Sequence, residues 1–199
     1  QKFSNDVPGN NQNLIDKYGF VSPILEGKIG SRGYNPEPVY HPVYGTERSH
    51  SGQDIGAKVG TPVYAIADGT VTFSYCIVPE VGTGVIYTYD EGNSAKLVFE
   101  GGNARYNHLS AFIVDGASTS PRYSSKDIKI DEKKVKRITI AETKEVKKGD
   151  IIGYTGNSGT STDPHLHFTL YLFGAPDAYT GDKYKGTVDP LKYVPFPLK

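Results

Sequence analysis

The sequence contains no methionine and no tryptophan, only one cysteine, and no excess of charge of either sign. Its 22 lysines and arginines balance its 22 aspartates and glutamates. Electrostatic attraction to nucleic acid or to an anionic membrane is therefore not expected to be its main function. No apolar run approaches the roughly 20 residues that span a bilayer, so we also expect a protein that does not cross a membrane.

The single cysteine and the missing methionine support two smaller expectations. Cys76 has no partner for a disulfide within the chain, and its position in the apolar run TVTFSYCIV predicts a buried core thiol. A chain that begins at Gln1 and contains no Met is expected to be a trimmed or mature form, from which any signal peptide has been removed.

The order of residue types along the chain predicts a short arm followed by one larger domain. A chain of 199 residues is most simply one domain with a substantial core. Residues 1–28 are rich in Asn, Pro and Gly, and within them NLIDKYGF predicts one short helix that Gly19 ends. We therefore expect an N-terminal arm over residues 1–28 and the main domain over residues 29–199.

From about Thr61 onward, short β-prone segments follow one another with no long helical period between them. TPVYAIA and TVTFSYCIV flank Asp68-Gly69, which predicts a hairpin, and a second turn is expected at residues 91–93, between GVIYTYD and AKLVFEG. Further strands are expected in ARYNHLSAFIV, KRITIAE, DIIGYTG and HLHFTLYLF. This spacing predicts an all-β fold, an antiparallel sheet with a core like a barrel-sandwich hybrid, and long surface loops near 115–135 and 174–187.

Two of the five histidines, His165 and His167, stand one residue apart in STDPHLHFTL. Residues i and i+2 of a strand point to the same face, so both imidazoles are expected on one face and the apolar Leu166, Phe168 and Leu170 on the other. Paired imidazoles can bind a metal or transfer protons. Two unrelated surface histidines on a strand edge would produce the same pattern.

A second cluster, ERSHSGQDIG, contains His50 and Asp54. The glycines around them argue against a helix, but in an extended or looped segment the two side chains can still share a side. With one histidine of the pair above, they would provide two imidazoles and one carboxylate with a fourth position open, which is the ligand set of a catalytic zinc site. A structural zinc site would fill all four positions, usually with thiolates.

These motifs are part of a longer resemblance, which runs roughly from Ile29 to Val194. HPVYGTERSHSGQDIGAKVGTPVYAIADGTV resembles the H-x3-D segment of the M23, or LytM/lysostaphin-like, zinc endopeptidases. VKKGDIIGYTGNSGTSTDPHLHF resembles the closing stretch of that family, which ends in H-x-H, ARYNHLS resembles the segment between them, and VDPLKYV resembles the usual end. The resemblance implies a zinc-dependent endopeptidase that hydrolyses peptide cross-links or stem peptides of bacterial peptidoglycan, outside the cytoplasm; we expect a monomer.

The resemblance also assigns roles to five residues. His50, Asp54 and His167 match the ligands of one Zn²⁺, and His108 and His165 match two catalytic histidines that are not ligands. Zn²⁺ lowers the pKa of a bound water from about 15.7 towards 7, and a neutral imidazole can accept or orient the proton. We expect His165 to act as the base or to orient the water, and His108 to assist the oxyanion and proton transfer. Spacing leaves the division between these two histidines open.

The approach to the first ligand is longer than the compact family pattern. Within it, Tyr44 lies in the loop where some relatives carry a tyrosine near the oxyanion, so it is a candidate for substrate binding. The long loops are expected to form walls beside the site and to determine which substrate fits. Diaminopimelate-type and glycine-rich cross-links both agree with the motifs.

Two other functions agree with parts of the pattern. Some relatives have lost the ligands and act as non-catalytic peptidoglycan-binding or partner-activating modules, but here every ligand and both partner histidines are present. Carriers of lipoyl or biotinyl groups share the barrel-sandwich fold, but they need an acceptor lysine at a hairpin tip, where this chain has Asp68-Gly69. We therefore favour the peptidase.

Overall fold

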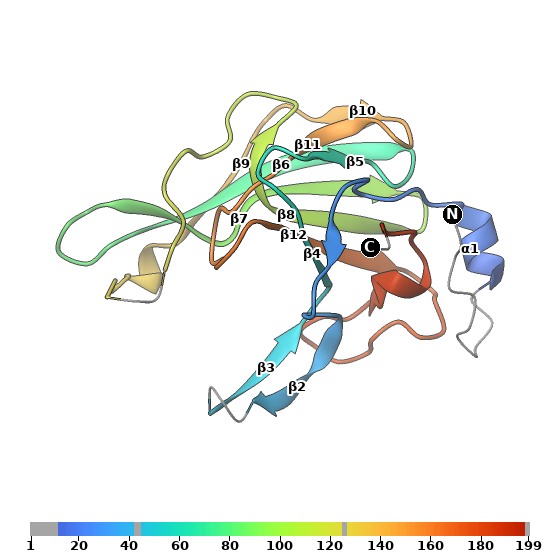
Figure 1. Cartoon of the computed structure of the whole chain (residues 1–199), viewed down its shortest axis with the longest axis horizontal. Coiled ribbons are helices and arrows are strands. Elements are labelled where there is room, and N and C mark those ends of the chain that lie inside the picture. Colours follow the sequence, from blue (N-terminus) through green and yellow to red (C-terminus); the bar gives the residue numbers. More distant parts are fainter. Residues whose placement is uncertain (1–11, 42–44, 125–126, 198–199) are drawn as a thin grey trace.

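Antiparallel strands dominate the computed structural model, which describes residues 12–41, 45–124 and 127–197 (Figure 1). Within these three ranges, two 3₁₀ turns, η1 and η2, and one α-helix accompany the strands. The elements follow the order α1 (Gln12–Tyr18), β1 (Lys28–Ile29), β2 (Asn35–His41), β3 (Thr46–His50), β4 (Gln53–Gly56), β5 (Pro62–Tyr64), β6 (Gly69–Pro79), β7 (Ile86–Phe99), β8 (Gly102–Phe112), η1 (Glu132–Lys134), β9 (Lys136–Thr139), β10 (Lys144–Val146), β11 (Ile151–Thr155), β12 (His165–Leu172), β13 (Thr187–Val188) and η2 (Pro190–Lys192). The expected all-β class with an antiparallel sheet is confirmed.

Most of the described strands belong to one large sheet. Its main path runs β1-β4-β12-β8-β7-β6-β10, and β11 pairs with β5 on one side and β8 on the other. The hairpin of β2 and β3 is separate from this sheet, projects from the body in Figure 1, and ends at His50. Strand β12 therefore lies between β4 and β8, where residues from distant parts of the sequence meet.

The core lies against the inner face of this sheet. On β12, Leu166, Phe168 and Leu170 are fully buried, as the alternation in the sequence predicts. Phe168 packs edge-on against Tyr106 of β8, with ring centroids 5.1 Å apart. Burying a Leu or Phe side chain stabilises a fold by about 1.5–3 kcal/mol, so this apolar face anchors the strand that carries both histidines of the pair.

The predicted short helix is confirmed. Helix α1 ends at Tyr18, and Gly19, which follows it, has a φ of 51° and donates its N–H to the carbonyl of Ile15 at 2.8 Å. Beyond it, Phe20 stacks on Tyr18 and meets Phe99 edge-on, and Ile24 is fully buried. The segment after α1 thus packs into the core of the main sheet. No helix in the three described ranges is long and apolar enough to cross a membrane.

The predicted hairpin at Asp68-Gly69 is wrong. Strand β5 pairs with β11, whereas β6 pairs with β7, β9 and β10. A Cβ on Gly69 would lie 2.1 Å from the carbonyl oxygen of Val98, so this glycine permits the close approach of β6 to β7 and does not form a tight hairpin turn.

The predicted turn at residues 91–93 is also wrong, because β7 continues through it from Ile86 to Phe99. Asp90 and Gly92 have φ values of 51° and 60°, and the register between β6 and β7 shifts at Tyr75 and Ile77. The turn-like residues therefore produce an irregularity within a long strand. The buried thiol was predicted correctly: Cys76 is fully buried, and its burial raises its pKa to about 12.

Candidate metal and catalytic site

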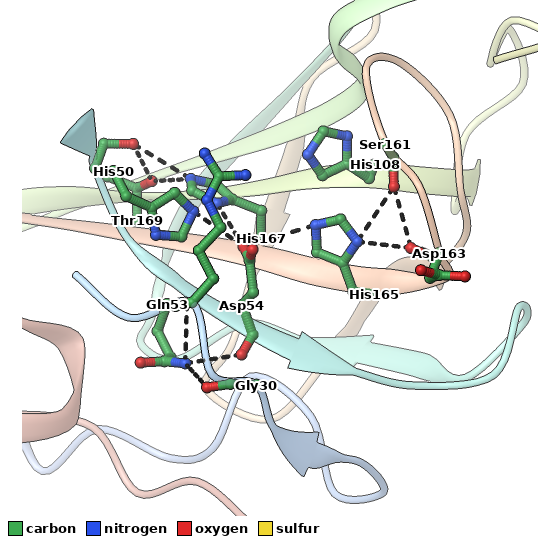
Figure 2. A network of polar contacts seen from close by, with 12 residues as sticks. Gly30, His50, Gln53, Asp54, His108, Ser161, Asp163, His165, His167 and Thr169 are labelled. Carbon is green, nitrogen blue, oxygen red and sulfur yellow. Dashed lines mark hydrogen bonds and ion pairs between the residues drawn. The ribbon is translucent and has the colours of Figure 1, made fainter. Parts of the chain in front are cut away.

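Five residues predicted from the sequence come together where β4, β8 and β12 lie side by side. The register places His167 of β12 opposite Asp54 of β4 on one side and opposite Asn107 of β8 on the other. His50 enters from the end of β3, and His165 from the first position of β12. Figure 2 shows Asp54 near the rings of His167 and His165, with His108 beside His165.

His50, Asp54 and His167 form a group that could hold a metal ion. Their three potential ligand atoms all lie within 4.8 Å of one another. His50 Nε2 lies 3.2 Å and His167 Nδ1 lies 2.8 Å from Asp54 Oδ1. Ligands placed about 2.0–2.2 Å from one zinc ion in a tetrahedron lie roughly 3.3 Å apart. The measured separations are therefore close to those that a single ion needs.

The hydrogen bonds of His50 leave one ring nitrogen without a partner. Its Nδ1 lies 2.8 Å from the carbonyl oxygen of Gly33, which can only accept, so Nδ1 carries the proton. In the neutral ring Nε2 then has a lone pair, yet it is buried, makes no hydrogen bond, and faces a carboxylate oxygen of Asp54. A buried lone pair held against a carboxylate oxygen is unfavourable unless a proton or a metal ion lies between them, so this arrangement fits a metal ion.

His167 has partners at both ring nitrogens. Its Nε2 lies 3.0 Å from the hydroxyl of Thr169 and 3.2 Å from that of Ser51. When Nε2–H donates to one of these hydroxyls, Nδ1 presents its lone pair beside Asp54. Metal-binding histidines usually donate their other N–H in this way, which fixes the ring and its tautomer. His50 and His167 thus present different nitrogens, Nε2 and Nδ1, towards the same carboxylate.

The charge state of the group also suits a metal. Burial alone would raise the pKa of Asp54. In the tautomer in which Nδ1 of His167 carries the proton, it donates to Asp54, and this hydrogen bond and the nearby ring of His50 outweigh the effect of burial and hold the pKa of Asp54 well below its usual range. A metal ion would take the place of that proton. Burial lowers the pKa of His167, against the opposing effect of Asp54. An ionised carboxylate and a neutral imidazole are the protonation states in which these side chains bind metals.

His165 and His108 have the same hydrogen-bond arrangement as His50. Nδ1 of His165 lies 2.8 Å from the carbonyl oxygen of Asp163, and Nδ1 of His108 lies 2.9 Å from that of Ser158. Each Nδ1 therefore donates its proton, which leaves Nε2 able to accept one. The two rings lie 4.7 Å apart between centroids, so two proton acceptors stand beside the proposed metal group.

His108 is the more constrained of the two. Burial, followed by the nearby rings of His165 and His167, lowers its pKa to about 3, so at neutral pH the ring is uncharged. Its φ of 64° lies in the left-handed region, which costs a residue with a Cβ roughly 1–2 kcal/mol. Such conformations persist where the surroundings enforce them, and they are concentrated at functional sites.

Gly52, which lies between the proposed ligands His50 and Asp54, has a steric function. A Cβ on Gly52 would lie 2.1 Å from the carbonyl oxygen of Phe168 and 2.9 Å from the hydroxyl of Thr169. Only glycine lets the segment from His50 to Asp54 lie this close to β12. This close approach brings the carboxylate of Asp54 next to His167.

Sequence reasoning did not find the groups that orient the imidazoles. Three of them are main-chain carbonyls, at Gly33, Ser158 and Asp163, and a carbonyl leaves no signal in residue identity. The hydroxyl of Thr169 could have been suspected, because it lies two residues after His167 and so on the same face of the strand. The predicted substrate-binding residue Tyr44 lies outside the described residues.

Comparisons with known proteins agree on one family. Residues 132–178, which include β12 and both of its histidines, match the model of peptidase family M23. The DD-carboxypeptidase/endopeptidase Mpg of Neisseria meningitidis is 31% identical over 165 residues, which cover 82% of this chain and 29% of that protein. The glycyl-glycine endopeptidase ALE-1 of Staphylococcus capitis is 33% identical over 138 residues, which cover 68% of this chain and 27% of that protein.

The chain therefore spans less than a third of the length of these curated relatives. The fold is also similar to that of a zinc-containing peptidase from Vibrio cholerae. The two superimpose with a TM-score of 0.52 at 22% identity, over 90% of this chain and 40% of the other.

Proposed function

Because this chain belongs to peptidase family M23, we propose that it is a zinc-dependent endopeptidase that hydrolyses peptide cross-links or stem peptides of bacterial peptidoglycan. The observation that carries this proposal is the convergence of His50, Asp54 and His167 around one carboxylate oxygen, with a buried nitrogen of His50 that has no hydrogen-bond partner. These three residues would hold one Zn²⁺.

The proposed reaction is hydrolysis of an amide bond. When bound, Zn²⁺ would polarise the scissile carbonyl and make water a nucleophile at neutral pH. The histidines would move the proton: Nε2 of His165 or His108 accepts it from the attacking water, and it is then delivered to the nitrogen of the departing amine. While it carries this proton, the same Nε2–H can donate a hydrogen bond to the oxyanion. Both roles use the ring nitrogen that the main-chain carbonyls of Asp163 and Ser158 leave free.

The names of the relatives support peptidoglycan as the substrate. One is named a DD-carboxypeptidase/endopeptidase, another a glycyl-glycine endopeptidase and a third a peptidoglycan DD-endopeptidase, so these names cover two kinds of peptide linkage. A protein that acts on this polymer works outside the cytoplasm, in the periplasm, at the cell envelope or as a secreted protein, and we propose such a location for this chain.

Digestion of muropeptides with known cross-links tests the proposal. Two substrates are needed, a D,D-cross-linked muropeptide dimer and a peptide bridged by pentaglycine, with the zinc-loaded chain and its Asp54→Asn variant compared by mass spectrometry. The expected result is pairs of fragments whose masses add up to that of the substrate plus one water, formed by the original chain and not by the variant. A chain that binds either substrate but cleaves neither would instead be the non-catalytic module.

A further inference from the structure

The left-handed backbone of His108 arises from an extra residue in β8. Along β7 the partners change from Asn93 to Ala95, two steps, while along β8 they change from Leu109 to Tyr106, three steps. One residue of β8 is therefore unmatched, as in a β-bulge, and His108, with a φ of 64°, lies within it. The bulge directs this ring towards His165 at the candidate site, so whatever holds the bulge also sets the position of the ring.

Two side chains hold the carbonyl of the next residue, Leu109. Asn93 Nδ2 donates to Leu109 O at 3.1 Å, and the hydroxyl of Ser158 donates to the same oxygen at 2.7 Å. The two residues are also joined to each other, because the main-chain N–H of Asn93 donates to Ser158 Oγ at 2.9 Å. Asn93 is 1% exposed, and it completes its hydrogen bonds with the main chain of Ser118 at 3.0 and 3.1 Å.

We propose that Asn93 and Ser158 form a clamp that fixes the bulge at His108 and so positions this imidazole for proton transfer. Ser158 acts at both ends of the histidine: its hydroxyl holds the carbonyl of Leu109, and its own carbonyl accepts the Nδ1 proton of His108 at 2.9 Å. Asn93 and Ser158 are positioning residues, since they act through His108. The inference rests on the proposed function, because it presumes the proposed catalytic role of His108.

The loop that carries Ser158 is itself fastened to β7. Thr160 N donates to the carbonyl of Asp90 at 2.9 Å, and Asp90 N donates to the hydroxyl of Thr160 at 3.0 Å. Gly159 N donates to the hydroxyl of Thr88 at 2.8 Å. A Cβ on Gly92 would lie 2.5 Å from Ser158, so the strand and the loop are in direct contact there. The irregular part of β7 thus gives the clamp a rigid support.

Single substitutions with matched controls test the clamp in the zinc-loaded 199-residue chain. Ser158→Ala removes the hydroxyl and keeps the carbonyl, Ser158→Thr retains a hydroxyl, and Asn93→Ala removes the amide. The control for the serine is Ser22→Ala, because Ser22 Oγ also donates to a main-chain carbonyl, that of Ile24, in another part of the fold. The control for the asparagine is Asn103→Ala, at the other end of β8, where the side-chain oxygen is buried without a partner.

Four quantities are measured for each variant: bound zinc, kcat, KM, and the nuclear Overhauser effect between the rings of His108 and His165. We expect Ser158→Ala to keep its zinc and its KM, to lose about 10- to 100-fold in kcat, and to show a weaker effect between the rings. Ser158→Thr should restore kcat, and both controls should keep kcat and the contact between the rings. Asn93→Ala should behave like Ser158→Ala.

Unchanged kcat and an unchanged ring contact in Ser158→Ala would overturn the clamp, and so would an equal fall of kcat in Ser22→Ala. If Asn93→Ala does not fold, Ser158→Ala alone decides, because Ser158 is only partly buried. If the unsubstituted chain cleaves neither muropeptide, the proposed function fails. The ring contact in Ser158→Ala then still tests whether the clamp positions His108.

Discussion

His165 and His167 lie two residues apart on β12, yet they present opposite ring nitrogens to the same carboxylate oxygen. Nε2 of His165 lies 3.6 Å from Asp54 Oδ1, whereas Nδ1 of His167 lies 2.8 Å from it. The difference follows from their hydrogen bonds: the carbonyl of Asp163 accepts a hydrogen bond from Nδ1–H of His165, while the hydroxyls of Thr169 and Ser51 lie beside Nε2 of His167. The longer distance agrees with His167 being one of the proposed metal ligands and with His165 lying beside them.

Alanine at each position of this pair should therefore have different effects. We expect His165→Ala to keep its zinc and to lose most peptidase activity, by a factor of about 10²–10⁴ typical of a lost general acid or base. His167→Ala should lose both, because it removes one of three proposed ligands. Metal content after dialysis and muropeptide cleavage measure the two effects. Equal loss of zinc in both variants would show that the roles are divided wrongly.

Zinc should also stabilise the folded chain. A ligand that binds only the native state raises the free energy of unfolding by about 2.7 kcal/mol at 100 times its dissociation constant. We expect the melting temperature to rise on addition of Zn²⁺ and to return on addition of a chelator. The rise should persist in His165→Ala and be absent in His50→Ala, since the buried Nε2 of His50 is a proposed ligand. A rise of equal size in His50→Ala would contradict the assignment.

The buried His108 should make the metal-free chain sensitive to acid. Its folded pKa of about 3 lies below the ordinary value near 6.5, so between these pH values the unfolded chain binds a proton that the folded chain does not. The contribution of His108 to the free energy of unfolding should thus be fully present above about pH 6.5. It should fall as the pH drops towards 3, by up to about 1.4 kcal/mol per pH unit. In His108→Gln, this part of the dependence of the unfolding free energy on pH should be absent, as measured by urea unfolding at a series of pH values with chelator present. Identical slopes in the two proteins would refute the expectation.

The sequence predicted what depends on residue type and local period. Alternation along HLHFTLYLF gave the buried face of Leu166, Phe168 and Leu170, and Gly19 marked the end of the helix. Strand pairing depends on long-range contacts, and local patterns did not predict it. Asp68-Gly69 has the composition of a hairpin turn, but its glycine instead allows β6 to lie close to β7.

The candidate site likewise has a part that the sequence predicted and a part that it did not. Its five polar side chains belong to recognisable motifs, and the structure brings all five together. The carbonyls that select each imidazole tautomer, and the bulge at His108, depend on how β7, β8 and the loop at Ser158 meet. That arrangement is set by tertiary packing, so no pattern in HLS or in HLH contains it.

The close approach at Gly52 gives a further prediction, because it acts on the metal group without altering any ligand. In Gly52→Ala, the new methyl carbon would lie 2.1 Å from the carbonyl oxygen of Phe168, far inside contact distance. The segment from His50 to Asp54 must then move away from β12. Asp54 and His167, which face each other across β4 and β12, should separate, and zinc affinity should fall by about 10-fold or more, as when outer partners of a metal site are lost.

Gly56→Ala is the matched control for Gly52→Ala. Gly56 is the last residue of β4, the strand that begins directly after Gly52, but a Cβ there would meet only the carbonyl oxygen of Lys28 at 3.7 Å, an ordinary contact. We expect this variant to bind zinc as the original chain does, and competition with a chromophoric chelator measures both affinities. Overpacking typically costs about 1–3 kcal/mol, so urea unfolding should also show a loss for Gly52→Ala that Gly56→Ala lacks. If Gly52→Ala bound zinc with unchanged affinity, the contact between this glycine and β12 would not position Asp54.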